Sequence, residues 1–270
     1  MLIRKLSAFF KKDFLLAGNC FIDTIANFLM TFLFIGIFYF LAKIVDKNPS
    51  FPIEQYTNKY FSFVFIGIIF IWYSYLILDN FSREIREYRI TGLLEVFLTT
   101  PTKTFAILLG ANLWNIFFST LQIIILLLLG RYFLGVKINS PDILSTFLIL
   151  MLTLLIFISI GLISAAISIL FSSKRDPALF LINCAISFLC GAYFPISLLP
   201  ESLQRISHII PMTYALRGLR QALLGGNLSG SLPWDLMILT ASLIILMPAS
   251  FVIFNYALKK MKTEGGFSYG

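Results

Sequence analysis

The sequence predicts an all-α membrane protein with six transmembrane helices in a single domain, residues 1–270. The first reason is composition, because 59% of the 270 residues are hydrophobic and 13% are charged, against about 45–50% and about 25% in soluble domains. The second is length: several apolar runs reach the roughly 20 residues that cross about 30 Å of hydrocarbon, where a helix satisfies its own backbone. The net charge of +8 lies at the ends of these runs, so we expect a lipid membrane and no nucleic acid as partner.

The first expected element is an interfacial helix within residues 1–18. Apolar side chains such as Leu2 and Phe9 share one helical face, and basic ones such as Arg4 and Lys12 share the other. Such a helix lies in the headgroup region with its basic side toward lipid phosphates. We expect no cleavable signal peptide, because the first apolar run begins near Phe21, is long enough to span, and has no small-residue cleavage pattern behind it.

Six apolar runs follow as the expected transmembrane helices. Their ranges are 21–41, 61–78, 105–129, 143–171, 178–193 and 236–258. Pro177 suits the first turn of the fifth helix, because its ring fixes φ near the helical value and its missing N–H is not needed there.

The segment 194–233 is too polar and too rich in proline to span a membrane. Pro195, Pro200 and Pro211 interrupt any continuous helix. Two apolar faces within it, the second formed by Ala215, Leu216, Leu219, Ala222 and Leu223, predict two short helices that lie on the membrane or dip into it. Three arginines of this segment are placed to reach lipid headgroups with their long side chains. These are Arg205, Arg217 and Arg220.

The distribution of basic residues predicts the topology. The amino end, the stretch 79–103, the break at 173–176 and the tail together hold 13 Lys or Arg, against five in the two short opposite loops and three in 194–233. The positive-inside rule therefore predicts that both termini and the stretch 79–103 are cytoplasmic. It also predicts that 194–233 lies at the outer face of the plasma or bacterial inner membrane.

The stretch 79–103 carries eight of the 34 charged residues between two apolar runs, so it must lie in water. Within it, apolar residues recur at i, i+3, i+4, i+7 and i+8, which predicts a short amphipathic helix that runs toward Pro101. They are Ile90, Leu93, Leu94, Phe97 and Leu98. We interpret this stretch as a docking surface for a soluble partner.

Few residues suggest chemistry on the chain itself. His208 is the single histidine, which excludes a metal site of two or more histidines, and the three cysteines form no disulfide or zinc pattern. The two Lys-Thr pairs, at Lys103 and Lys262, follow no glycine, so no phosphate-binding loop of the G-x-x-x-x-G-K-[ST] type exists. We therefore expect no catalytic residue, no metal and no cofactor on this chain.

Polar residues inside the spans are candidates for contacts with a substrate, because burying them in lipid is costly. A polar stripe in the third span favours hydrogen bonds between helices over such contacts. Its members are Asn112, Asn115, Ser119 and Gln122. For Asn183 and Ser187 in the fifth span, and for the aromatic residues of the second, packing and lining a path stay equally open.

Two segments resemble the ABC-2 type transporter permeases. The run R-E-I-R-E-Y-R-I-T-G-L-L-E-V-F-L-T-T-P at 83–101 resembles the first cytoplasmic loop of that family. The run G-A-Y-F-P-I-S-L-L-P-E-S-L-Q-R-I-S-H-I-I-P-M-T-Y-A-L-R-G-L-R-Q-A-L-L-G-G at 191–226 resembles the segment between its last two spans. Leu93 stands where the family usually has Thr, while Gly92 and Glu95 agree with it. The resemblance extends over essentially the whole chain.

The resemblance implies the permease subunit of an ATP-driven exporter, a homodimer or a heterodimer that rests on a separate ATPase subunit, which binds the ATP and Mg. A coupling helix would lie at about 84–100, and the residues implied in ATPase coupling are Arg83, Glu84, Glu87, Arg89, Gly92, Leu93, Leu94, Glu95, Phe97 and Leu98. The path would follow the dimer interface along spans two and five, with Phe70, Tyr73, Asn183, Ser187 and Phe194. An outer gate would include Pro195, Pro200, Pro211 and Tyr214.

Two other hypotheses remain at this point. A membrane-embedded enzyme that acts on lipid-linked substrates would need several acidic residues or histidines at one membrane level. A channel or purely structural protein would not need a charged amphipathic helix in water. The cargo is not identified by the sequence, because the family exports drugs, lipids, polysaccharides and other amphiphiles.

Overall fold

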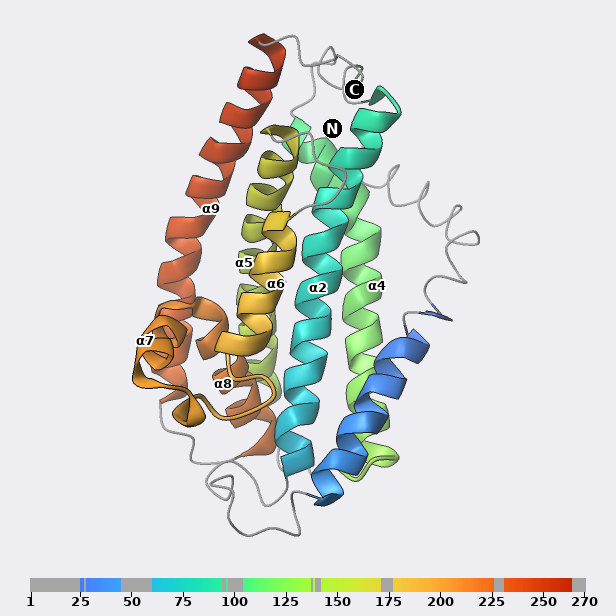
Figure 1. The fold of residues 1–270 in the computed structure, drawn as a ribbon, viewed down its shortest axis with the longest axis vertical. Helices are drawn as coiled ribbons and strands as arrows, with labels where there is room; N and C mark the ends of the chain where they lie inside the picture. The colour runs from blue at the N-terminus through green and yellow to red at the C-terminus, as the bar shows by residue number, and fades with distance from the viewer. Residues whose placement is uncertain are drawn as a thin grey trace.

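The computed structural model describes residues 25–26, 28–44, 60–93, 96, 104–136, 138, 142–170, 177–225 and 231–263, and the part of the chain that it describes is all α (Figure 1). An apolar helix at Phe28–Ile44 comes first. The elements that follow are α2 (Tyr60–Ile90), α4 (Thr104–Tyr132), α5 (Ile143–Leu170), α6 (Pro177–Leu189), the 3-10 turn η1 (Ile196–Leu198), α7 (Glu201–Ile209), α8 (Pro211–Leu224) and α9 (Leu232–Thr263).

Four described helices are long and apolar enough to cross a membrane. They lie at Tyr60–Ile90, Ile107–Tyr132, Ile143–Leu170 and Leu232–Met261. Two shorter apolar helices lie at Phe28–Ile44 and Leu179–Leu189, inside the ranges of the first and fifth predicted spans or close to them. The prediction of a multi-pass, all-α protein is therefore confirmed, and the count of six crossings stays a prediction.

Helix α2 is the central helix of the bundle. It packs against α4, α5, α6 and α8, and 78% of its most apolar 18-residue stretch is buried. In Figure 1 it stands between α4 and α6, with α5 behind. Gly161 of α5 allows close approach to α2, because a Cβ there would lie 3.0 Å from the Phe81 ring. Small residues at such contacts let transmembrane helices pack closely.

The polar segment contains the two short helices that the sequence predicts. Helix α8 packs against α2, α5 and α9, and its predicted apolar face, Ala215, Leu216, Leu219, Ala222 and Leu223, is buried. Gly225 ends α8 with φ +66, a left-handed conformation that glycine adopts without strain. Helix α7 is mostly exposed, with Ser207 as its buried residue. Helix α8 therefore inserts between long helices, whereas α7 lies on the surface of the bundle.

The charged stretch differs from the prediction. Helix α2 does not end at 78 but continues to Ile90, so Glu84, Glu87 and Arg89 form its last turns and not the start of a separate helix. Thr91 donates from its hydroxyl to the Glu87 carbonyl oxygen at 2.7 Å, and Gly92 has φ +70, which interrupts a continuous helix over 84–100. With 31 residues, α2 is about 46 Å long. This length exceeds the hydrocarbon thickness, so the helix is long enough for its charged last turns to lie outside the hydrocarbon.

Several predicted features lie outside the described residues. The interfacial helix at 1–18 is one of them, and most of the predicted apolar ridge of the stretch 79–103 is another. The ridge and coupling residues concerned are Leu94, Glu95, Phe97 and Leu98.

Candidate functional site

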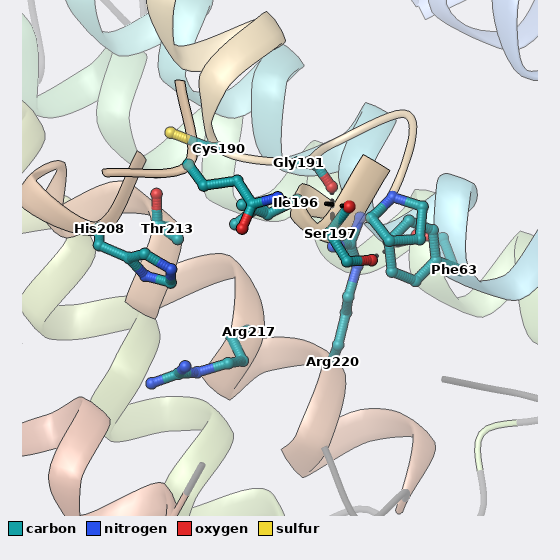
Figure 2. A pocket seen from close by; sticks show the side chains of 11 residues that line it. Phe63, Cys190, Gly191, Ile196, Ser197, His208, Thr213, Arg217 and Arg220 are labelled. Carbon is teal, nitrogen blue, oxygen red and sulfur yellow. Dashed lines mark hydrogen bonds between the residues drawn. The ribbon is translucent and has the colours of Figure 1, made fainter. Parts of the chain in front are cut away.

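A buried arginine fastens α8 to two other parts of the bundle (Figure 2). Arg220 is 6% exposed. Its Nη1 and Nη2 donate to the carbonyl oxygens of Gly191 and Ala192, both at 2.9 Å, and its Nε donates to the Phe63 carbonyl oxygen at 3.3 Å. Its guanidinium also lies over the Phe63 ring, 3.5 Å from the centroid. One side chain therefore joins α8, α2 and the turn that follows α6.

Two glycines make this geometry possible. A Cβ at Gly67 would lie 2.0 Å from the Ala192 carbonyl oxygen, closer than any real contact, so only glycine lets this turn press against α2. Gly191 has φ +69, a conformation that costs other residues about 1–2 kcal/mol. The two glycines therefore allow the turn to bring two of the three carbonyl acceptors of Arg220, those of Gly191 and Ala192, into place.

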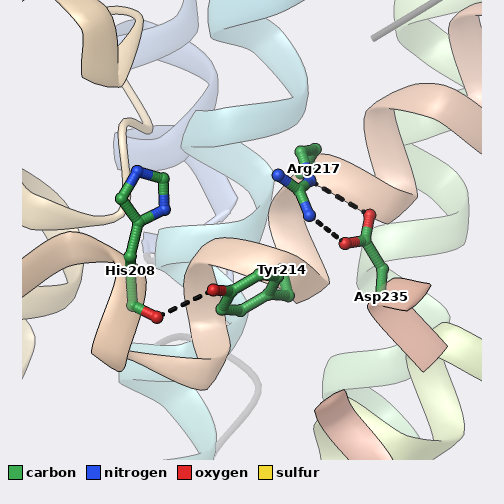
Figure 3. Close-up of polar contacts among 4 residues, drawn as sticks. All are labelled: His208, Tyr214, Arg217 and Asp235. Carbon is green, nitrogen blue, oxygen red and sulfur yellow. Dashed lines mark hydrogen bonds and ion pairs between the residues drawn. The ribbon is translucent and has the colours of Figure 1, made fainter. Parts of the chain in front are cut away.

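A second arginine fastens α8 to α9 (Figure 3). The Arg217 guanidinium donates through Nε to Asp235 Oδ2 at 3.2 Å and forms an ion pair with Oδ1 through Nη2. Asp235 lies in the first turn of α9 and is fully buried. The Arg217 guanidinium also lies 5.0 Å from the centroid of the Tyr214 ring, and the Tyr214 hydroxyl donates to the His208 carbonyl oxygen at 2.8 Å. This chain of contacts links α7, α8 and α9.

We call this arrangement the α8 junction; it consists of Phe63, Gly67, the turn 190–195, Arg217, Arg220 and Asp235. A cavity of about 190 Å³ lies within it, between the turn, α7 and α8. Its walls include Phe63, Ile196, Thr213 and both arginines, which Figure 2 shows around it. Ser197 and His208 also line it and are exposed, so the cavity reaches the surface beside α7.

The junction corrects the prediction that its arginines extend toward headgroups. Arg220 points into the bundle and Arg217 binds a buried carboxylate, whereas Arg205 on α7 is exposed as predicted. A buried charge is stable only where hydrogen bonds or an opposite charge compensate its lost hydration. Arg220 meets this condition with carbonyl groups, and Arg217 meets it with Asp235.

The structure separates the predicted path residues into two groups. Phe70 and Tyr73 lie in the core, with ring centroids 5.7 and 6.0 Å from that of Phe157 on α5. They do not share a surface with Asn183 and Ser187, which lie half-buried on α6. The physical reason is that α2 is covered on several sides by its own neighbours.

On α6, Asn183 donates through Nδ2 to the Leu179 carbonyl oxygen of its own helix at 3.1 Å. Its buried Oδ1 has no hydrogen-bond partner among the described residues. Phe194, in the turn after α6, packs edge-on against Phe188 with centroids 5.4 Å apart.

The predicted gate residues mark the boundaries of the short helices. Pro200 precedes α7 as its N-cap, and Pro211 is the first residue of α8. Pro195 is buried and lines the cavity, while Tyr214 makes the contacts given above.

The described coupling residues lie at the far end of α2. Arg83 donates to Asn80 Oδ1 at 2.6 Å on its own helix. Arg89 donates through Nη1 to the Ser168 carbonyl oxygen at 3.2 Å, which ties this end to the end of α5. Arg83 and Glu87 are exposed, so this end of α2 presents charge to a solvent or a partner.

The polar stripe of α4 is buried at Asn112, Ser119 and Gln122, but among the described residues the predicted hydrogen bonds between helices are not found for its two buried amides, Asn112 and Gln122. Asn112 donates to the Leu108 carbonyl oxygen of its own helix at 3.0 Å. Its Oδ1 and the Gln122 Nε2 have no partner in the described part of the chain. A hydrogen bond between helices is formed instead by Thr120, whose hydroxyl oxygen lies 3.2 Å from that of Tyr73 on α2.

Sequence reasoning missed Gly67 and Asp235, and it misjudged the two arginines. Two arginines three apart in a segment with a buried apolar face were a usable signal, because positions three apart share one side of a helix. The acceptors of Arg220 could not be found in this way, since they are backbone carbonyls distant in sequence.

The fold and the α8 junction define a multi-pass α-helical membrane protein with a short helix inserted at one end of the bundle. Residues 42–252 match the family described as ABC-2 family transporter protein. Because the match covers most of the chain, the protein belongs to this family and is a membrane permease of an ABC transporter. No curated protein matches the chain significantly.

Proposed function

We propose that this chain is the membrane subunit of an ATP-driven exporter, which crosses the cytoplasmic membrane six times and works as a dimer with a separate ATPase. The observation that carries the proposal is the family match over 42–252. The excess of basic residues supports cytoplasmic termini, which places the charged end of α2 inside and α8 outside. ATP and Mg would bind to the partner subunit.

The path is proposed along α6 of two facing copies. Its exposed side carries Phe180, 68% exposed, and Phe188, 55% exposed, with Cys184 between them. Asn183 and Ser187 lie half-buried on the same helix, so an amphiphilic cargo would meet both apolar and polar groups. Phe194 continues this surface outward. Phe70 and Tyr73 are left out of the path because they lie in the core.

The outer gate is proposed at the short helices. Pro195, Pro200, Pro211 and Tyr214 define where the chain turns between α6, α7 and α8. Because α8 is fastened to α2 through Arg220, opening of this gate would follow movement of α2.

Coupling is proposed at the charged end of α2 and the following residues to 103. Glu87 and Arg83 are exposed and lie beyond the apolar part of the helix, so opposite charges on a partner can select and orient it. A rigid helix that continues from this end to the α8 junction would carry the partner's movement across the membrane.

The double change Glu84→Lys and Glu87→Lys tests this proposal, with Glu201→Lys on the exposed surface of α7 as matched control. Glu87 is exposed and Glu84 is partly exposed in the last turns of α2. The double variant should therefore insert normally, since charge changes at the surface usually alter the free energy of unfolding by no more than about 0.5 kcal/mol. We expect it to reduce copurification of the ATPase, or to leave ATP hydrolysis without transport, while Glu201→Lys behaves as the unchanged chain. Unchanged copurification and unchanged transport in the double variant would exclude this end as the coupling element.

No specific observation favours the enzyme hypothesis. Over the described residues, no group of three or more His, Cys, Asp or Glu side chains converges as metal ligands would.

A further inference from the structure

We propose that the cavity of the α8 junction binds a phosphate-type acidic headgroup, with the apolar part of the same molecule lying along α7. Such a site needs neither the ATPase nor a dimer, and so goes beyond the exporter role.

The cavity wall is cationic. Arg217 and Arg220 are among its eleven lining residues, and none of the eleven is Asp or Glu. Three hydrogen bonds of Arg220 end on neutral carbonyl oxygens, which hold the guanidinium in place at the cavity. Asp235 offsets charge at Arg217 but does not line the cavity. In a wall of low dielectric constant this charge acts strongly on an anion.

The polar groups of the wall suit an oxyanion. Guanidinium groups hold phosphate or carboxylate oxygens with geometrically defined N–H donors. Ser197, on the turn η1, also lines the cavity and carries a hydroxyl group. The imidazole of His208 has no side-chain hydrogen bond within the described residues and is exposed on α7. Donors therefore come from three separate elements around one space.

The size of the cavity selects a headgroup rather than a whole amphiphile. The cavity volume of about 190 Å³ is several times the volume of about 30 Å³ that one water molecule occupies in the liquid. It is smaller than the roughly 300–1,000 Å³ of pockets that enclose drug-sized ligands. The rest of a larger ligand must therefore lie outside the cavity.

The surface beside the mouth is apolar. Leu198 and Ile206 are 47% and 45% exposed, and Ile209 is 80% exposed. These side chains lie on η1 and α7, the same elements that carry Ser197 and His208. A molecule with its acidic group at the arginines can therefore place an acyl chain on α7, where each buried CH₂ group adds to binding.

The test uses the purified full-length chain in neutral detergent, with binding measured by titration calorimetry. The probes are dioctanoyl phosphatidylglycerol, dioctanoyl phosphatidylcholine and glycerol phosphate. We expect phosphatidylglycerol to bind more tightly than phosphatidylcholine, which has the same chains and no net charge. If glycerol phosphate binds as tightly as phosphatidylglycerol, the ligand is a free phosphate compound; if it binds much more weakly, the ligand is an acidic lipid or a lipid-like cargo.

A carboxylate introduced into the cavity wall by substitution tests whether the lipid binds in this cavity. Ser197→Asp adds a carboxylate at an exposed lining position, and Ser202→Asp adds the same charge on the exposed surface of α7 outside the cavity. We expect Ser197→Asp to raise the Kd for phosphatidylglycerol about tenfold or more, because like charges within a few ångströms repel strongly at a partly buried site, and Ser202→Asp to leave it within about twofold because that charge is solvated. His208→Glu makes the same test from α7 if Ser197→Asp folds poorly. Equal affinity for the two lipids, or equal effects of the two serine changes, would overturn the proposal.

Discussion

The two ends of α2 are held in different ways. At one end every residue from Phe61 to Phe70 is buried, the Phe63 carbonyl accepts from Arg220, and Gly67 is in contact with the turn after α6. At the other end Phe81 and Ile85 are also buried, but Arg83 and Glu87 are exposed, and hydrogen bonds of Ser82 and Arg89 join this end to α5. One helix therefore combines an end that is enclosed by its neighbours with an end that also presents charged side chains at the surface.

This difference suggests how movement would pass through the molecule. Because α8 is fastened to α2, to the turn after α6 and to α9, it cannot open as an independent lid without breaking buried hydrogen bonds. A buried acceptor left without its donor costs about 1–3 kcal/mol. We expect the α8 junction to move as one body with α2, and local rearrangement to be concentrated at the charged end.

The largest predicted effect is that of Arg220→Met. Methionine keeps much of the volume and fits irregular space, but it leaves three buried carbonyl oxygens, those of Phe63, Gly191 and Ala192, without the donor they have now. We expect the free energy of unfolding to fall by at least about 3 kcal/mol, seen as a lower midpoint of thermal unfolding in detergent.

Arg205→Met is the control for the same change in residue type. Arg205 is exposed on α7, so we expect its replacement to stay within about 0.5 kcal/mol. If both arginine variants unfold at the same temperature, the α8 junction is not the fixed end of α2, and the comparison of the two ends fails.

The parts of the fold that the sequence predicted are those that depend on local composition. Apolar length located the helices, and a helical apolar pattern located the buried face of α8. The full length of α2 does not follow from the sequence, because the charge near Asp79 predicts where the apolar run ends, whereas a helix continues in water as long as its residues favour it. Phe70 and Tyr73 were assigned to a path because an aromatic side chain in a span has the same sequence pattern whether it packs in a core or faces a lumen.

The candidate site was predicted less well than the fold. Ion pairing between Arg217 and Asp235, and the three acceptors of Arg220, depend on helices that meet only in the folded chain. Positive charge in a polar segment is compatible with either headgroup contact or burial, and packing decides between them. Gly67 carries no local signal, since the atom that requires a glycine there is the Ala192 carbonyl oxygen.

The second prediction compares glycines at the two ends of α2. Gly67→Ala places a methyl group 2.0 Å from a backbone oxygen, so the turn must move away from α2, and we expect a loss of about 2–3 kcal/mol in the free energy of unfolding. Gly92→Ala meets no atom within 4 Å and is strained only by its φ of +70, for which we expect about 1 kcal/mol. Thermal unfolding of both variants in the same detergent measures the difference.

Gly36→Ala serves as the control, because its Cβ also meets nothing within 4 Å and no left-handed φ strains it. Alanine favours a helix over glycine by about 1 kcal/mol, so this variant should be as stable as the unchanged chain or more so. A Gly67→Ala variant as stable as Gly92→Ala would show that the turn moves away easily, and that the close packing at the Gly67 end of α2 contributes nothing measurable to stability.

The smallest predicted effect concerns the tie between α2 and α5 near the charged end. Ser82 donates to the Ser164 hydroxyl at 2.8 Å, and both side chains are buried. Hydrogen bonds between transmembrane helices average about 0.6 kcal/mol in double-mutant cycles, because the alternative state within the membrane also finds partners. We expect a coupling energy of that size from Ser82→Ala, Ser164→Ala and the double variant, with Ser74→Ala as control, since the Ser74 hydroxyl donates within its own helix. A value above about 2 kcal/mol would make this end as firmly held as the other. A value near 0.6 kcal/mol would leave the charged end of α2 the weaker of the two attachments, and so the place where the work of a partner can change the packing.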